Sequence, residues 1–182
     1  MTQLVGFAGS LRAGSYNRAL LRAAAAAMPD GASLEVLSID DVPLYNGDVE
    51  ERDGIPAAVQ SIKDKIAAAD GLVIATPEYN GGVPGVAKNV IDWISRPGSD
   101  IPRVTHGKPV ALMGATPGGL GTAFSQAGWL QVLRTLRFRV WVGGGPFYLS
   151  SAPKSFDDDL NPNDELKERV ATYMAGFVKS LE

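Results

Sequence analysis

The chain has 182 residues, of which 45% are hydrophobic and 20% charged, and its formal net charge at pH 7 is −3. This composition predicts one globular domain, residues 1–182, with no basic surface for nucleic acid and no polybasic patch for a membrane. The absence of Cys excludes disulfides, thiol nucleophiles and thiolate metal sites. The single His, His106, argues against His-based metal sites and Ser-His triads.

In the first half of the chain, short apolar runs alternate with helical patterns. We expect strands at residues 3–8, 33–39 and 72–76. We expect helices at residues 17–28, 56–70 and 84–95. Residues 40–54 show no strong periodicity and are interpreted as a polar connection.

The start of the chain has neither a basic region nor a long apolar run, so we expect no signal peptide and a cytoplasmic protein.

The second half continues the alternation, with strands expected at residues 110–115 and 138–142 around a helix at 122–136. Gly143-Gly144-Gly145-Pro146 is expected to end the last strand, and an irregular segment follows at 147–161. Asn161-Pro162 then begins a terminal helix. The alternation predicts an α/β fold, a doubly wound five-stranded parallel sheet in the order 2-1-3-4-5 with helices on both faces.

The loop Gly9-Ser-Leu-Arg-Ala-Gly-Ser-Tyr-Asn17 joins the first strand to the first helix. A helix N-terminus attracts anions through its free N–H groups, and the serines, Asn17 and Arg12 add further donors. Ser15 and Tyr16 stand where a Walker A loop has Lys and Ser/Thr, and the dinucleotide pattern G-x-G-x-x-G is absent. The loop therefore favours a phosphate monoester. A plain strand-to-helix turn with a capped helix remains the alternative.

Two more unusual loops follow the third and fourth expected strands, and the predicted strand order brings all three loops to one edge of the sheet. The second loop offers Pro77, Glu78, Tyr79, Asn80 and Gly81 as a flat surface with polar groups. The third, residues 116–121, has few bulky side chains and suits the edge of a ring. A flat ring joined to a phosphate monoester describes FMN. For Glu78, a structural hydrogen bond or a subunit contact is favoured over general acid–base catalysis.

Together with the first loop, the segment Thr76-Pro-Glu-Tyr-Asn-Gly-Gly-Val-Pro-Gly-Val-Ala-Lys-Asn-Val-Ile-Asp-Trp93 resembles the NADPH-dependent FMN reductase family. This flavodoxin-like group includes chromate and quinone reductases. The resemblance implies that the FMN phosphate and ribityl chain contact Ser10, Arg12, Ser15, Tyr16 and Asn17. It implies that Pro77, Glu78, Tyr79, Asn80 and Gly81 surround the isoalloxazine ring. The other edge of the ring is then flanked by Ala115, Thr116, Gly118 and Gly119.

The resemblance also implies the activity, an FMN-dependent NAD(P)H oxidoreductase with NADPH or NADH as donor. The expected acceptors are small molecules: quinones, chromate, azo compounds or free flavin. No protein side chain is expected to be catalytic and no metal is expected, because the flavin supplies the chemistry. Family members form homodimers or homotetramers, and the candidate interface helices carry Val90, Trp93, Phe124 and Trp129. The alternatives are a flavodoxin-type electron carrier and a flavin-free phosphate-binding domain.

Overall fold

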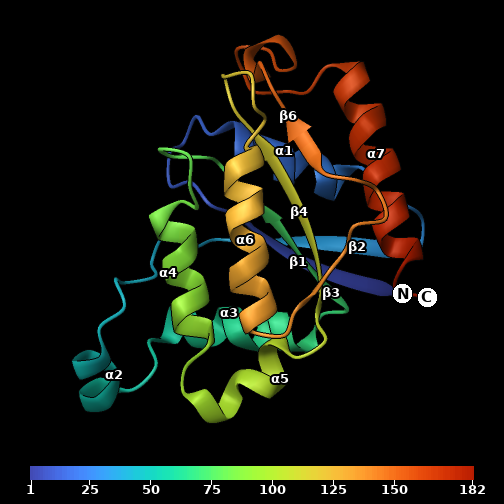
Figure 1. The fold of residues 1–182 in the computed structure, drawn as a ribbon. Coiled ribbons are helices and arrows are strands. Elements are labelled where there is room, and N and C mark those ends of the chain that lie inside the picture. The colour runs from blue at the N-terminus through green and yellow to red at the C-terminus, as the bar shows by residue number, and fades with distance from the viewer.

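The computed structural model describes residues 1–182 and contains a parallel sheet in the order β2-β1-β3-β4-β5 (Figure 1). The strands are β1 (Thr2–Ala8), β2 (Ala32–Leu37), β3 (Gly71–Ala75), β4 (Pro109–Ala115), β5 (Arg139–Val140) and β6 (Phe147–Leu149). β1 pairs with both β2 and β3, so the winding direction reverses between β1 and β3. The predicted fold class and strand order are confirmed.

The helices lie on both faces of this sheet (Figure 1). They are α1 (Tyr16–Ala26), α2 (Gly47–Asp53), α3 (Ala57–Ala68), α4 (Gly85–Ile94), α5 (Ile101–Thr105), α6 (Ala123–Thr135) and α7 (Asp164–Lys179), with short 3₁₀ turns η1 (Gly98–Asp100) and η2 (Ala152–Lys154). α1 and α7 share one hydrophobic cluster, and α3, α4 and α6 share the other. None of the helices is both long and apolar enough to span a bilayer.

Strand β3 shows how one apolar run serves both clusters. Leu72 and Ile74 point to the α3–α4–α6 side, whereas Val73 and Ala75 point to the α1–α7 side. Side chains alternate across a strand, so a central strand covered on both faces must be apolar throughout. All five residues of β3 are buried. This is why the continuous apolar run in the sequence identifies the strand correctly.

The fifth strand resumes after the glycine break, and the sequence interpretation, which predicted the break, missed this return. β5 is only two residues long and pairs with the start of β4, whereas β6 pairs with the end of β4. Residues 141–146 leave the sheet between them. Gly145 has a left-handed φ of 67°, and added Cβ atoms at Gly143 and Gly144 would lie 2.8 and 2.4 Å from the Trp141 ring. The glycines thus make room for the indole, and the chain returns to the sheet in a region predicted to be irregular.

Tyr173 of α7 supplies a hydrogen bond at this interruption. Its hydroxyl donates to the Leu112 carbonyl at 2.7 Å. The ring also packs edge-on against Trp141, 4.8 Å between centroids. Burial raises the pKa of the Tyr173 hydroxyl well above its usual range, so it stays protonated and remains a donor.

Two other differences from the sequence interpretation have clear causes. Helix α2 forms inside the expected polar connection because Asn46 caps it, accepting from the Asp48 N–H, but none of its residues is buried. A helix without a buried face leaves no apolar periodicity in the sequence.

Of the candidate interface residues, Val90, Trp93 and Trp129 are at most 1% exposed and belong to the core; only Phe124 is accessible, at 56%.

The end of the sheet opposite the three loops carries a compact ion cluster. The Lys63 ammonium, 1% exposed, lies 2.8 Å from the Asp100 carboxylate and also donates to the Arg96 carbonyl. Arg103 bonds the same carboxylate at 2.6 Å and reaches Asp64 at 2.9 Å. Hydrogen bonds from Arg103 and Lys63 hold the pKa of Asp100 well below its usual range. The cluster joins η1 and α5 to α3.

Candidate functional site

The first loop leaves β1 at Gly9 and lies directly against the second loop. The Gly9 N–H donates to the Ala75 carbonyl at 2.8 Å. A Cβ at this position would lie 2.9 Å from the Ala87 Cβ and 3.1 Å from both Pro77 and Pro84. Only glycine fits this contact, so Gly9 fixes the start of the loop where the β1 and β3 segments meet.

Most backbone N–H groups in the rest of the first loop form no hydrogen bond within the protein. Ser15 caps α1 by accepting from the Arg18 N–H at 3.3 Å, and Ser10 accepts from the Arg12 N–H at 3.4 Å. No acceptor within the protein reaches the N–H groups of Ser10, Leu11, Ala13, Gly14 or Ser15. The Arg12 guanidinium is exposed and forms no ion pair, unlike that of Arg18, which is held by Asp40 at 2.6 Å.

This donor set fits a phosphate dianion, because unused N–H groups at the start of a helix together with an unpaired guanidinium are what such a group needs. The loop therefore fits the phosphate end of FMN. Tyr16, also expected at this end, packs its ring on Phe156, 5.6 Å between centroids. That contact fixes the first turn of α1.

The second loop turns sharply at Asn80 and Gly81, whose φ angles are 52° and 69°. Tyr79 and Gly82 exchange backbone hydrogen bonds across this turn, at 3.3 and 3.0 Å. Two successive positive φ angles characterise a type I′ turn, which the sequence Asn-Gly favours. The turn leaves Tyr79 47% exposed, with its hydroxyl 3.3 Å from the Ser10 Oγ of the first loop.

Glu78 acts as the cap of another helix. One of its carboxylate oxygens accepts from the N–H groups of Phe124 and Ser125 at 2.9 and 3.1 Å. Thr122, which precedes α6, has a left-handed φ of 69° and provides no side-chain cap. A carboxylate at a helix N-terminus satisfies free donors and interacts well with the helix dipole. The carboxylate is thus engaged in a structural hydrogen bond, as the sequence interpretation favoured.

Asn17 ties the first loop to the third. Its amide oxygen accepts from the Ala115 N–H at 2.9 Å, and its amide nitrogen donates to the Ala115 carbonyl at 2.8 Å. Asn17 is 3% exposed, so this pairing is shielded from water. Beyond Ala115, Thr116 bonds the Leu149 carbonyl through its N–H, and Gly118 and Gly119 are exposed.

The site residues expected from the sequence therefore lie together at one edge of the sheet, but their side chains fall into two groups. Arg12, Tyr79, Asn80 and the exposed glycines remain available to a ligand, whereas the side chains of Asn17 and Glu78 are used to connect the loops. Four large apolar side chains also surround these loops and remain between 46% and 57% exposed: Leu11, Tyr79, Leu120 and Phe124. Such a border suits a flat, partly apolar molecule.

One polar network beneath the site was missed. Thr76 Oγ1 lies 2.8 Å from the Ser125 Oγ and accepts from the Trp129 indole N–H at 2.9 Å. All three residues are fully buried. They fix the base of the second loop to α6. No local pattern in the sequence relates residues about 50 positions apart, so the sequence alone gave no indication of these hydrogen bonds.

The comparisons with known proteins agree with this geometry. Residues 2–154 match the family described as NADPH-dependent FMN reductase. The chain belongs to this family. It is 43% identical to the NAD(P)H-dependent FMN reductase of Pseudomonas aeruginosa over 85% of the chain and 81% of that protein. It is also 43% identical to a quinone reductase of Escherichia coli, over 72% of the chain and 69% of that protein.

Among solved structures, the fold is similar to FerB, a flavoenzyme NAD(P)H:(acceptor) oxidoreductase from Paracoccus denitrificans. The TM-score is 0.83 at 29% identity, over 98% of both chains. A flavodoxin-type WrbA-like protein from Agrobacterium tumefaciens shares the fold at a TM-score of 0.63 and 16% identity. The chain is therefore an oxidoreductase of the FMN class that uses NAD(P)H, and the predicted family, fold and cofactor are confirmed.

Proposed function

We propose that this protein is an NAD(P)H-dependent quinone reductase, with residues 1–182 acting as one FMN-binding domain. The observation that carries the proposal is that the first loop has backbone N–H groups without acceptors on both sides of the unpaired Arg12. The two loops beside it are suited to a flat ring. Relatives named quinone reductase support the acceptor class. Chromate, azo compounds and free flavin are further proposed acceptors, since a partly exposed ring selects little by shape.

In this proposal Arg12, Ser10 and the loop N–H groups hold the phosphate, and Ser15 and Tyr16 fix the first turn of α1 beside it. The second loop, Pro77 to Gly81, supports one side of the ring, and Ala115, Thr116, Gly118 and Gly119 border the other edge. The backbone N–H groups of Glu78, Asn80, Gly81 and Gly119 have no acceptor within the protein, so they can donate to ring carbonyls and nitrogens.

FMN, when bound, supplies the two-electron chemistry between NAD(P)H and the acceptor. The chain itself binds and orients, and no side chain in these loops is assigned a proton-transfer role. Asn17 and Glu78 keep the three loops at fixed separations through their hydrogen bonds to Ala115 and to α6. Because both nicotinamide and quinone must reach the same exposed ring, we propose that they bind alternately.

The deciding experiment is a visible spectrum of the purified protein, before and after NADPH, followed by steady-state kinetics with a benzoquinone. We expect a flavin spectrum that bleaches with NADPH and recovers with quinone, and parallel lines in double-reciprocal plots. A colourless protein that FMN cannot reconstitute would refute the assignment of the first loop. A flavin that NADPH does not reduce would indicate an electron carrier, and intersecting lines would contradict a shared face.

A homodimer or homotetramer and a cytoplasmic location are retained as proposals from the sequence. Phe124 and Leu120 beside the loops are the exposed apolar residues that an interface near the site would bury. Light scattering of the purified protein measures the mass directly.

A further inference from the structure

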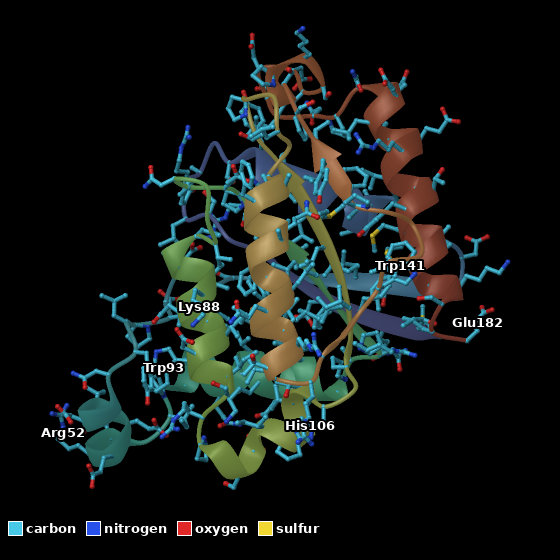
Figure 2. All side chains as sticks on the ribbon, viewed as in Figure 1. Arg52, Lys88, Trp93, His106, Trp141 and Glu182 are labelled. Carbon is cyan, nitrogen blue, oxygen red and sulfur yellow. The ribbon has the colours of Figure 1, made fainter.

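A cavity of about 250 Å³ lies at the β4 edge of the sheet, where residues 141–146 interrupt the fifth strand. One wall is α6 and the other is the interrupting segment itself. Figure 2 shows Trp141, a wall residue, beside α7 and on the far side of β4 from Trp93. None of the loop residues predicted to bind FMN lines this cavity. The strand interruption thus creates a space separate from the candidate flavin site.

The lining of the cavity is neutral and mostly apolar. Eight of its eleven residues are hydrophobic and none is charged. The rings of Trp141, Tyr148 and Tyr173 line it, and Leu130 and Val142 lie at its exposed side, 47% and 77% exposed. An ionised ligand would lose its hydration without a partner charge, so this lining selects neutral molecules, aromatic ones in particular.

Gln126 provides a polar anchor in this lining. It is only 4% exposed, and its amide nitrogen donates to both the Thr122 hydroxyl at 3.1 Å and the Phe147 carbonyl at 3.0 Å. Its amide oxygen accepts no hydrogen bond from the protein. Every side-chain oxygen that is fully enclosed in this protein has a hydrogen-bond partner. The Gln126 oxygen, which has none, is therefore in contact with open space, and Gln126 is one of the residues that line the cavity. A buried acceptor of this kind favours a ligand with a donor.

We propose that this cavity binds a neutral aromatic alcohol of one or two rings. Its hydroxyl donates to the free amide oxygen of Gln126, and its ring packs against Trp141 and Tyr148. The Tyr173 hydroxyl already donates its proton to the Leu112 carbonyl, so it does not donate to the ligand, whereas the Gln126 amide oxygen is an acceptor to which no protein group donates. The proposal does not depend on the redox function, because none of the residues proposed to bind FMN lines the cavity.

The test is isothermal titration calorimetry of the purified, flavin-loaded protein with 2-naphthol and with 2-methoxynaphthalene, which lacks the donor. We expect 2-naphthol to bind more tightly by roughly two- to tenfold, the range of one neutral hydrogen bond. Ala127 is exposed on α6 and lines the cavity, so Ala127→Leu fills it without disturbing the core. We expect that variant to weaken 2-naphthol binding by more than tenfold while keeping its flavin spectrum.

Ala175→Leu is the matched control, because Ala175 is exposed on α7 and does not line the cavity. It should bind 2-naphthol like the unaltered protein. Equal affinity for the two probes would overturn the role of Gln126. Unchanged binding in Ala127→Leu would place the probe elsewhere, at the flavin for example, and overturn the site. A lower oligomer mass in Ala127→Leu with unchanged 2-naphthol binding would assign the cavity to a second copy instead.

Discussion

The two ends of the sheet differ in whether their charged and polar groups have partners within the chain. At the end formed by η1 and α5, Lys63, Asp100, Arg103 and Asp64 are joined in one cluster. At the end formed by the three loops, Arg12 and a set of backbone N–H groups have no partner within the chain. Paired charges join elements of the fold, whereas unpaired donors indicate a ligand that the chain itself does not supply.

The largest expected effect comes from breaking the paired end. Asp100→Asn leaves the buried Lys63 ammonium with only the Arg96 carbonyl, and a buried charge without its partner is strongly destabilising. We expect the free energy of unfolding, measured in urea at pH 7, to fall by about 3 kcal/mol. FMN affinity of the folded protein should not change, since the cluster lies far from the loops.

Asp53→Asn is the control, because its ion pair with Arg52 is exposed on both sides and should leave stability almost unaltered. The pH dependence gives a second readout. The pKa of Asp100 is lower in the folded protein than its ordinary value of 3.8. The stability that the Asp100 carboxylate contributes is therefore complete above pH 3.8 and is lost as the pH falls below that value. Asp100→Asn should therefore lose stability less steeply in acid. An equal slope would contradict the pairing.

An intermediate effect is expected at the unpaired end. Arg12→Ala removes a cation that no protein group uses, so the stability of the apoprotein should stay the same. FMN binding should weaken by about 1.5–3 kcal/mol, the value of a hydrogen bond to a charged group. Flavin fluorescence titration measures this directly. Unchanged FMN affinity would mean that the phosphate lies elsewhere, and lower apoprotein stability would mean that Arg12 has a structural partner.

The smallest effect is expected where the loops are joined to the scaffold. Glu78→Ala removes the cap of α6 and should lower stability by about 1 kcal/mol. Glu78→Gln keeps an acceptor and should recover most of this loss. Turnover with NADPH and quinone should remain near normal in Glu78→Gln, because the amide oxygen can accept from the Phe124 and Ser125 N–H groups as the carboxylate does. A large loss of turnover with intact stability would instead identify Glu78 as an acid or base.

The strands and turns could be predicted because each depends on local sequence. The strand order and the convergence of the loops followed from the alternation of strands and helices, which is typical of a doubly wound sheet. The run Leu72 to Ala75 is apolar throughout, as a central strand must be, and the Asn80-Gly81 turn is encoded by its two residues. Long-range pairings could not be predicted. Asn17 bonds Ala115 across 98 positions, and its amide has the same chemistry whether it binds a ligand or the backbone.

The interruption of the fifth strand shows a second limit. Its glycines and Pro146 indicate that a strand ends there, but they carry no information that the chain rejoins the same edge at Phe147. At the same place Tyr173 of α7, distant in sequence, donates its hydroxyl hydrogen bond to the Leu112 carbonyl. A contact of this kind is decided by tertiary packing, which overrides local propensity.

The Asn17–Ala115 pairing has a consequence for how the protein is made. The first loop emerges from the ribosome early, yet its position depends on a backbone group at the end of β4. Chains fold as their N-terminal parts appear, but this loop cannot reach its final geometry until the residues that reach Ala115 have been synthesised. We therefore expect an N-terminal fragment that ends before β4 to carry the motif of the first loop without its final geometry, and to bind no FMN.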